Sequence, residues 1–194
     1  MKALIIDSCI RGKNSRTLRI AEHIARQLEA KYQIEWVRLN EHPFLPLTPE
    51  SMQERAKNIY TDHADEYARQ FARSDLIVIA APFWDMSFPA SLKAFLERIS
   101  ISGITFRDEA AATAGNCRAK KLIYVTTRGM NLEDDDPRQQ ATPYIKALCW
   151  LWGIPEVVTV SAIGMDYVTD DEREKRIEEA CRLGTRICED ILNG

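Results

Sequence analysis

The chain has 194 residues, a length that suits one domain, and we predict a single domain over residues 1–194. Its 26 Lys and Arg against 29 Asp and Glu give a net charge of −3, which excludes the strongly basic surface typical of nucleic-acid-binding proteins. The hydrophobic fraction of 45% disfavours disorder and suffices for a core that encloses a pocket. No stretch approaches the roughly 18 apolar residues of a membrane span.

The cysteines and histidines bear on metal sites and on cellular compartment. No CxxC pair is present, and three histidines are too few and too dispersed for a histidine-rich metal site, so we predict no bound metal. An odd number of scattered cysteines also disfavours a disulfide framework, and reduced thiols in the cytoplasm are the simpler interpretation. The five are Cys9, Cys117, Cys149, Cys181 and Cys188.

Short runs rich in β-branched and aliphatic residues predict five strands. The run over 76–82 is apolar without alternation, which is typical of a strand covered on both faces. The run over 33–39 contains charged residues and fits an edge strand. The predicted strands cover residues 2–7, 33–39, 76–82, 121–127 and 157–162.

Apolar residues at steps of three and four predict a helix after each strand. Thr48 is placed to cap the second helix, with Pro49 in its first turn. Gly153 is expected to end the fourth, and Thr169 with Glu172 forms a capping box before the last. The apolar stripes of the predicted helices cover residues 18–28, 52–71, 92–99, 145–152 and 177–191.

Because strand and helix alternate five times, we predict an α/β fold: a parallel sheet with helices on both faces, in three layers. Right-handed crossovers favour a doubly wound sheet with the flavodoxin-like order 2-1-3-4-5. The segments 40–48 and 103–120 are predicted excursions from this pattern. Ligands of such sheets bind beyond the carboxyl ends of the strands, which directs attention to the loops 8–17, 83–89 and 127–142.

The first of these loops is rich in hydroxyl groups. Ser15 and Thr17 stand at the expected helix start, where amides and the helix dipole favour an anion, although Ser15 alone also suits a simple helix cap. The loop has neither the GxGxxG nor the GxxxxGK[ST] motif. Cys9 is interpreted as a small, inert residue at a strand end rather than as a reactive thiol.

The second and third loops offer aromatic and cationic groups. Residues 82–89 include three aromatic side chains that either line a flat ring ligand or pack the turn locally. In the third loop Arg128 supplies a fixed charge and Gly129 permits a positive φ or a close backbone approach. The acidic run over 134–136 is interpreted as a solvated loop rather than a cation site.

At these loops the sequence resembles the FMN-dependent NADH-azoreductases, a family close to the NAD(P)H:quinone oxidoreductases of flavodoxin-like fold. The most specific stretch is Ala-Pro-Phe-Trp-Asp-Met-Ser-Phe-Pro-Ala-Ser-Leu-Lys over residues 81–93, and the resemblance extends along nearly the whole chain. The other matching segments are 103–106, 127–129, 142–144, 153–154 and Gly164.

The resemblance implies an enzyme that moves a hydride from NADH or NADPH through FMN to quinones or azo compounds in a ping-pong cycle. It also implies a homodimer with the active site at the subunit interface. No catalytic side chain is expected, because hydride transfer through a flavin does not demand one. The positions that would hold the FMN phosphate are Cys9, Ser15, Arg16 and Thr17. Those that would meet the ring are Phe83, Trp84, Asp85, Met86, Thr127, Arg128, Gly129 and Met130.

Two alternatives stay open at this point. One is a non-enzymatic flavin electron carrier of the same fold, which the modest net charge of −3 mildly disfavours because flavodoxins tend to be markedly acidic. The other is a flavin-free interaction domain that kept only the fold. Three departures from the family pattern keep the second alternative open: Cys9 replaces a serine, Asp85 an asparagine and Met130 a second glycine.

The departure at Asp85 generates a prediction. A carboxylate beside the ring disfavours an anionic reduced flavin, so Asp85 should lower the flavin potential unless it is protonated or paired with a cation. We expect potentiometry of Asp85→Asn to give a higher midpoint than that of the unsubstituted protein. An unchanged midpoint would contradict this role.

Overall fold

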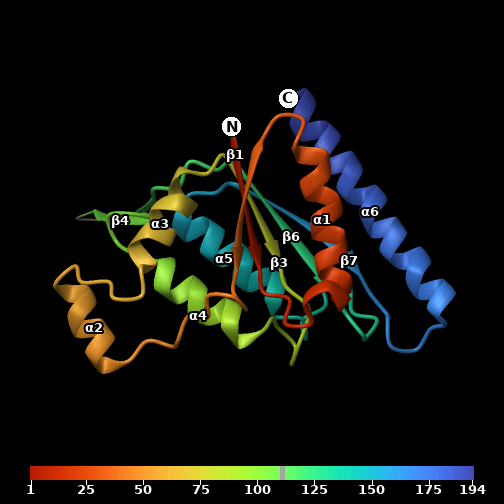
Figure 1. Ribbon diagram of the computed structural model, residues 1–194, viewed down its shortest axis with the longest axis horizontal. Helices are drawn as coiled ribbons and strands as arrows, with labels where there is room; N and C mark the ends of the chain where they lie inside the picture. The colour runs from red at the N-terminus through yellow and green to blue at the C-terminus, as the bar shows by residue number, and fades with distance from the viewer. Residues whose placement is uncertain (110–111) are drawn as a thin grey trace.

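A computed structural model describes residues 1–109 and 112–194 and shows a five-stranded, all-parallel sheet (Figure 1). Its order is β2-β1-β3-β6-β7, which confirms the predicted order 2-1-3-4-5 because β6 and β7 are the fourth and fifth strands of the sheet. The strands are β1 (Lys2–Asp7), β2 (Gln33–Arg38), β3 (Leu76–Ala80), β6 (Lys121–Thr127) and β7 (Glu156–Ala162).

The central position of β3 follows from its composition. All five of its residues are buried, as the unbroken apolar run predicts for a strand with helices over both faces. β2 lies at the edge, as its charged residues predict, and only Val37 in it is fully buried. Parallel pairing of β1 with β2 and with β3 brings Asp7 level with Arg38 and Ala80, so the carboxyl ends of these strands meet on one side of the sheet.

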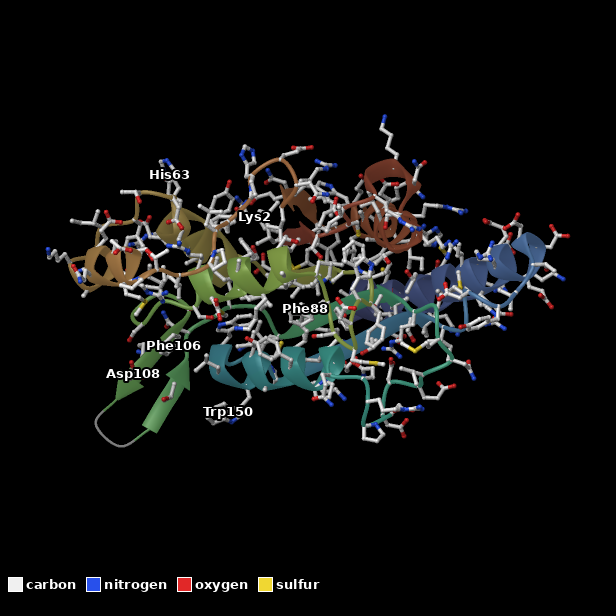
Figure 2. All side chains as sticks on the ribbon, turned by 90° about the horizontal axis from the view of Figure 1, so that it is seen from below. Lys2, His63, Phe88, Phe106, Asp108 and Trp150 are labelled. Carbon is white, nitrogen blue, oxygen red and sulfur yellow. The ribbon has the colours of Figure 1, made fainter. Side chains whose placement is uncertain are left out.

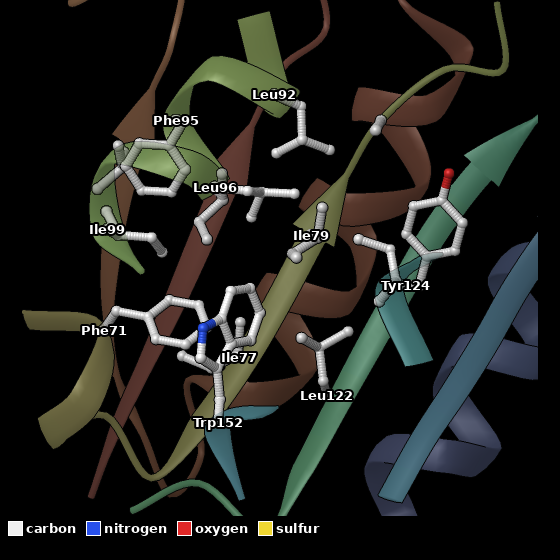
Figure 3. Packing of buried hydrophobic residues seen from close by; sticks show 14 of the residues in the cluster. Phe71, Ile77, Ile79, Leu92, Phe95, Leu96, Ile99, Leu122, Tyr124 and Trp152 are labelled. Carbon is white, nitrogen blue, oxygen red and sulfur yellow. The ribbon is translucent and has the colours of Figure 1, made fainter. Parts of the chain in front are cut away.

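Helices cover the sheet on both faces (Figure 1). α1 (Arg16–Leu28) and α6 (Asp170–Asn193) lie side by side on one face, where they share a buried apolar cluster with the sheet. α3 (Ala64–Arg73), α4 (Ala90–Ile99) and α5 (Ala141–Trp152) enclose a second cluster on the other face. In that second cluster the rings of Phe71 and Trp152 pack edge to face with centroids 4.7 Å apart, beside Ile77 and Leu122 of the sheet (Figure 3).

Local signals set the ends of several helices. Thr169 caps α6, and its reciprocal bonds with Glu172 form the predicted capping box. Gly153 ends α5 in the left-handed conformation, with φ of 75°, as predicted. The capping of α2 (Pro49–Ala56) by Thr48, with Pro49 at its first position, is also confirmed.

The single helix predicted over 52–71 is wrong. The chain forms α2 and α3 instead, separated by a turn in which Asn58 and His63 both have φ of 57°. Apolar residues at steps of three and four can continue across such a break. Their spacing indicates which side chains share a face, but it does not indicate the backbone angles between them. His63, on that apolar period, begins α3 as an exposed side chain (Figure 2).

The predicted excursion over 103–120 contains a small hairpin of β4 (Phe106–Glu109) and β5 (Ala112–Gly115), while residues 110–111 lie outside the described residues (Figure 2). Gly115 rests against the end of α5, where a Cβ would lie only 2.0 Å from the nitrogen of Gly153. Backbone contact of this kind excludes any larger residue at Gly115. No helix within the described residues has both the length and the apolar character needed to cross a membrane.

The two capping boxes generate a prediction about stability. Thr169→Ala should lower the free energy of unfolding in urea by about 1 kcal/mol, because it removes an N-cap from a helix that packs into the core. Thr48→Ala is the matched control. It removes the same kind of cap from α2, which buries no residue, so it should loosen that helix locally with a much smaller global effect. Equal losses in both variants would contradict this account.

Candidate functional site

Three loops meet beyond the carboxyl ends of β1, β3 and β6. The amide of Phe83 donates to the carbonyl of Thr127 at 3.1 Å, and the hydroxyls of Thr17 and Thr127 are hydrogen-bonded at 2.7 Å. These bonds hold the loops around a pocket of about 240 Å³. Its lining residues are Arg11, Ser15, Arg16, Thr17, Pro82, Phe83, Trp84, Thr127, Arg128, Gly129, Met165 and Asp166.

One end of the pocket is the N-terminus of α1. The Ser15 hydroxyl caps this helix by accepting from the amide of Leu18 at 3.2 Å, and the amide of Arg19 donates to the Ser15 carbonyl. The amides of Arg16 and Thr17 have no acceptor within the helix. Burial lowers the pKa of Arg16, and the neighbouring charges of Arg173 and Arg11 lower it further. The carboxylates of Asp166 and Asp170 partly offset these cations, and the free amides with Arg16 and Arg11 favour an anion at the helix end.

Cys9 lies away from this pocket. Its side chain is fully buried, its Sγ lies 3.6 Å from the carbonyl oxygen of Ala80, and its amide donates to Asp7 Oδ1 at 2.8 Å. Burial and then the carboxylate of Asp7 raise the pKa of the Cys9 thiol far above its ordinary value. The inert interpretation of this cysteine therefore fits the structure better than a reactive thiol.

The second loop divides its residues between the pocket and the surface. Phe83 and Trp84 line the pocket, whereas Asp85 and Met86 form the exposed tip of a tight turn with φ of 49° and 64°. Mutual backbone bonds between Trp84 and Ser87, at 3.0 and 2.8 Å, close this turn. Two successive positive φ angles are typical of a type I′ turn, which Asp tolerates and Met does not favour.

In the third loop Arg128 is buried completely, with no exposed surface. Its Nη1 donates to the carbonyl of Leu132 at 2.7 Å, its Nη2 pairs with Asp134, and its guanidinium lies 5.6 Å from the centroid of the Phe83 ring. Its Nε has no hydrogen-bond partner among the described residues. Arg128 thus supplies both a fixed charge and one spare donor at the pocket wall.

Gly129 does not have a positive φ, but it closely approaches the segment after β7. A Cβ on this residue would lie 1.8 Å from Oδ2 of Asp166. The segment after β7 follows the loop closely, because the amides of Gly164, Met165 and Asp166 donate to the carbonyls of Met130, Arg128 and Gly129. Met130 itself lies outside the pocket and is 37% exposed.

Eight of the twelve predicted site residues line the pocket, and Cys9, Asp85, Met86 and Met130 do not. Four further lining residues lay outside the prediction: Arg11, Pro82, Met165 and Asp166. The last two follow β7, and their position beyond the carboxyl end of a sheet strand was the available signal.

A larger hollow of about 840 Å³ lies between α3 and the segment after β2, beside Glu41, His42 and Glu66. We favour the smaller pocket as the functional site, because it lies beside β1, where the strand order reverses and doubly wound sheets bind their ligands. Among residues 1–109 and 112–194, no group of three or more His, Cys, Asp or Glu side chains is arranged to hold a metal ion.

A sequence profile of the family described as having a flavodoxin-like fold matches residues 1–185. The chain belongs to this family. One similar member is an FMN-dependent NADH:quinone oxidoreductase of Clostridium perfringens. It is 34% identical over 125 residues, and the match covers 63% of this chain and 63% of that one. A protein of the same name from Stenotrophomonas maltophilia is 28% identical over 183 residues, or 93% of this chain and 92% of that one. The matches to five clostridial members span between 56% and 63% of their lengths.

Solved structures show the same flavodoxin-like fold. An FMN-dependent NADH-azoreductase from Bacillus anthracis, solved in complex with FMN, has a TM-score of 0.79 at 18% identity and covers 97% of this chain and 100% of its own. An NAD(P)H:quinone oxidoreductase from Methanothermobacter marburgensis has a TM-score of 0.74 at 20% identity, with 96% and 98% covered.

The buried cysteines generate a prediction. Only the thiolate is alkylated, and burial raises the pKa of Cys117 and Cys149 to about 12 and that of Cys188 to about 11, besides its effect on Cys9. Peptide mapping after brief alkylation of the native protein at pH 8 should therefore find the half-buried Cys181 labelled first. In urea all five should react alike. Labelling of native Cys9 as fast as Cys181 would contradict the buried position of Cys9.

Proposed function

We propose that this chain binds FMN in the 240 Å³ pocket and reduces quinones or azo compounds with NADH or NADPH as the hydride donor. The observation that carries the proposal is one pocket with two chemically different ends, an anion-binding helix terminus and a wall of aromatic rings. FMN carries a phosphate at one end and a flat ring at the other, which matches these two ends of the pocket. The names of the similar family members, FMN-dependent NADH:quinone oxidoreductase, support this assignment.

The residues at the helix end fit a phosphate ester. The amides of Arg16 and Thr17 and the Thr17 hydroxyl provide donors, while Arg16 and Arg11 provide charge. Because the whole chain carries a net charge of −3, attraction for the phosphate must come from this local cluster and not from the overall field. Cys9 plays no part in this account, since its thiol is buried beneath the loop.

The other end fits a heteroaromatic ring. Phe83 and Trp84 offer apolar faces, and the unpartnered Nε of the buried Arg128 is a donor for a ring carbonyl or nitrogen. Bound FMN would supply the hydride chemistry between the pyridine nucleotide and the acceptor. The chain's residues bind and orient the reactants, and none is required as an acid or a base.

Exposed side chains around the pocket support a homodimer. A pocket of about 240 Å³ is small beside the roughly 300–1,000 Å³ of typical ligand sites. Part of a flavin would therefore lie over the pocket rim, where Trp84, Met86 and Met130 are 43%, 41% and 37% exposed. A second subunit would cover these apolar groups, and the donor and acceptor would then use the same space in turn, which is the basis of a ping-pong cycle.

We place the protein in the cytoplasm, where reduced cysteines and pyridine nucleotides coexist.

Spectroscopy tests this function. FMN added to the purified protein should bind with a shifted visible spectrum, and NADH added without oxygen should bleach the flavin band. A quinone should then restore the band. A protein that binds FMN but responds to neither NADH nor NADPH would instead be an electron carrier, and one that takes up no FMN would be a flavin-free member of the fold.

The phosphate assignment is tested by the same titrations on a variant. Arg16→Ala should weaken FMN binding about 10- to 100-fold, since a hydrogen bond to a charged group contributes about 1.5–3 kcal/mol, and should leave riboflavin binding unchanged. Arg19→Ala is the matched control, because Arg19 lies one turn further along α1 and pairs with Glu174 outside the pocket. Equal losses for FMN and riboflavin in Arg16→Ala would exclude a phosphate contact.

A further inference from the structure

The acidic run over residues 134–136 has an uneven structure that its uniform sequence does not suggest. Asp134 pairs with the buried Arg128, and Asp136 pairs with Arg138 through bonds of 2.7 and 2.9 Å. Asp135 is exposed, and the described residues give it no ion pair. The interpretation of the run as a solvated loop therefore holds for Asp135 but not for Asp134, whose carboxylate is bonded to a cation in the pocket wall.

The position of Asp134 is fixed by its own backbone. Its carbonyl accepts from Nε2 of Gln139 at 2.8 Å, and Oε1 of Gln139 accepts from the amide of Thr142 at the start of α5. Gln139 has no exposed surface. The backbone of Asp134 is thus anchored to a helix by a buried side chain, and its 39% exposed carboxylate is oriented by its pair with the guanidinium.

The same loop is tied to the other ring-facing loop. The amide of Gln140 donates to the carbonyl of Met86 at 2.8 Å, and the Arg128 guanidinium lies over Phe83. Arg128 is therefore embedded between both loops, where solvent screens its charge less than it would at the surface. How much of that charge a bound ring experiences depends on the carboxylate paired with it.

We propose that Asp134 is a positioning residue that sets the charge presented to the flavin ring, by holding Arg128 in place and neutralising its charge. This inference rests on the proposed binding of FMN. Asp134 does not line the pocket, so it acts only through Arg128. With Asp134 ionised the pair is neutral, and the site gives little preference to an anionic reduced ring. With the carboxylate removed, Arg128 becomes an unbalanced cation beside the ring and favours the reduced state.

The test compares the affinities of the protein for oxidised and reduced FMN. In Asp134→Asn the ratio of reduced to oxidised affinity should rise about tenfold, which for a two-electron couple is a midpoint about 30 mV higher. Asp135→Asn is the matched control, because it removes the same charge one residue away without an ion pair and should change the ratio less than twofold. Asp134→Glu, which keeps the charge, should restore the original ratio.

A double-mutant cycle separates charge from structural support. In an Arg128→Met background, Asp134→Asn should no longer raise the ratio of reduced to oxidised FMN affinity, because the cation that Asp134 neutralises is absent. Should Asp134→Asn fold poorly, Asp134→Ser makes the same charge change with a smaller side chain. Equal shifts in Asp134→Asn and Asp135→Asn would overturn this inference alone. Failure of the unsubstituted chain to bind FMN would overturn the proposed function and this inference together.

Discussion

The burial of β3 on both faces is the constraint on which the site depends. A strand with no exposed residue cannot slide or change register without moving the apolar clusters on both sides. Its pairing with β6 continues past the end of the strand, since the amide of Ala81 donates to the carbonyl of Val125 and that of Phe83 to Thr127. The sheet thereby delivers two loops to the pocket in a fixed relation.

The two ends of the pocket rest on different physical supports. The anion end is a property of backbone geometry, because any helix beginning at residue 16 would present free amides at this place. The ring end depends on buried side chains instead: Arg128 is stabilised by Leu132, Asp134 and the face of Phe83. Substitutions in α1 and in the loop after β6 should therefore have different costs, the first mainly in ligand affinity and the second in the shape of the loop as well.

Much of the fold could be predicted from the sequence because it follows from local patterns. The apolar run of β3, the charges of β2 and the capping box at Thr169 each specify their own environment. The break between α2 and α3 could not be predicted, since it depends on left-handed residues, Asn58 and His63, that leave the apolar period intact. At the site, the sequence predicted which loops supply the residues, but it did not predict the direction in which each side chain points. Cys9 turns inward toward the carbonyl of Ala80, and Asp85 lies at the exposed tip of the turn that Trp84 and Ser87 close, through bonds that only the folded chain forms.

The closeness of Gly129 and Asp166 affects which substitutions the ring-facing loop tolerates. A side chain at 129 and the carboxylate at 166 compete for the same space, with only 1.8 Å between a Cβ and Oδ2. A side chain at 129 would require the exposed carboxylate of Asp166 to turn away, although 37 residues separate the two positions along the chain. A larger residue at 129 would therefore be accommodated by a new conformation of Asp166, and a redesign of the ring-facing loop has to take the segment after β7 into account.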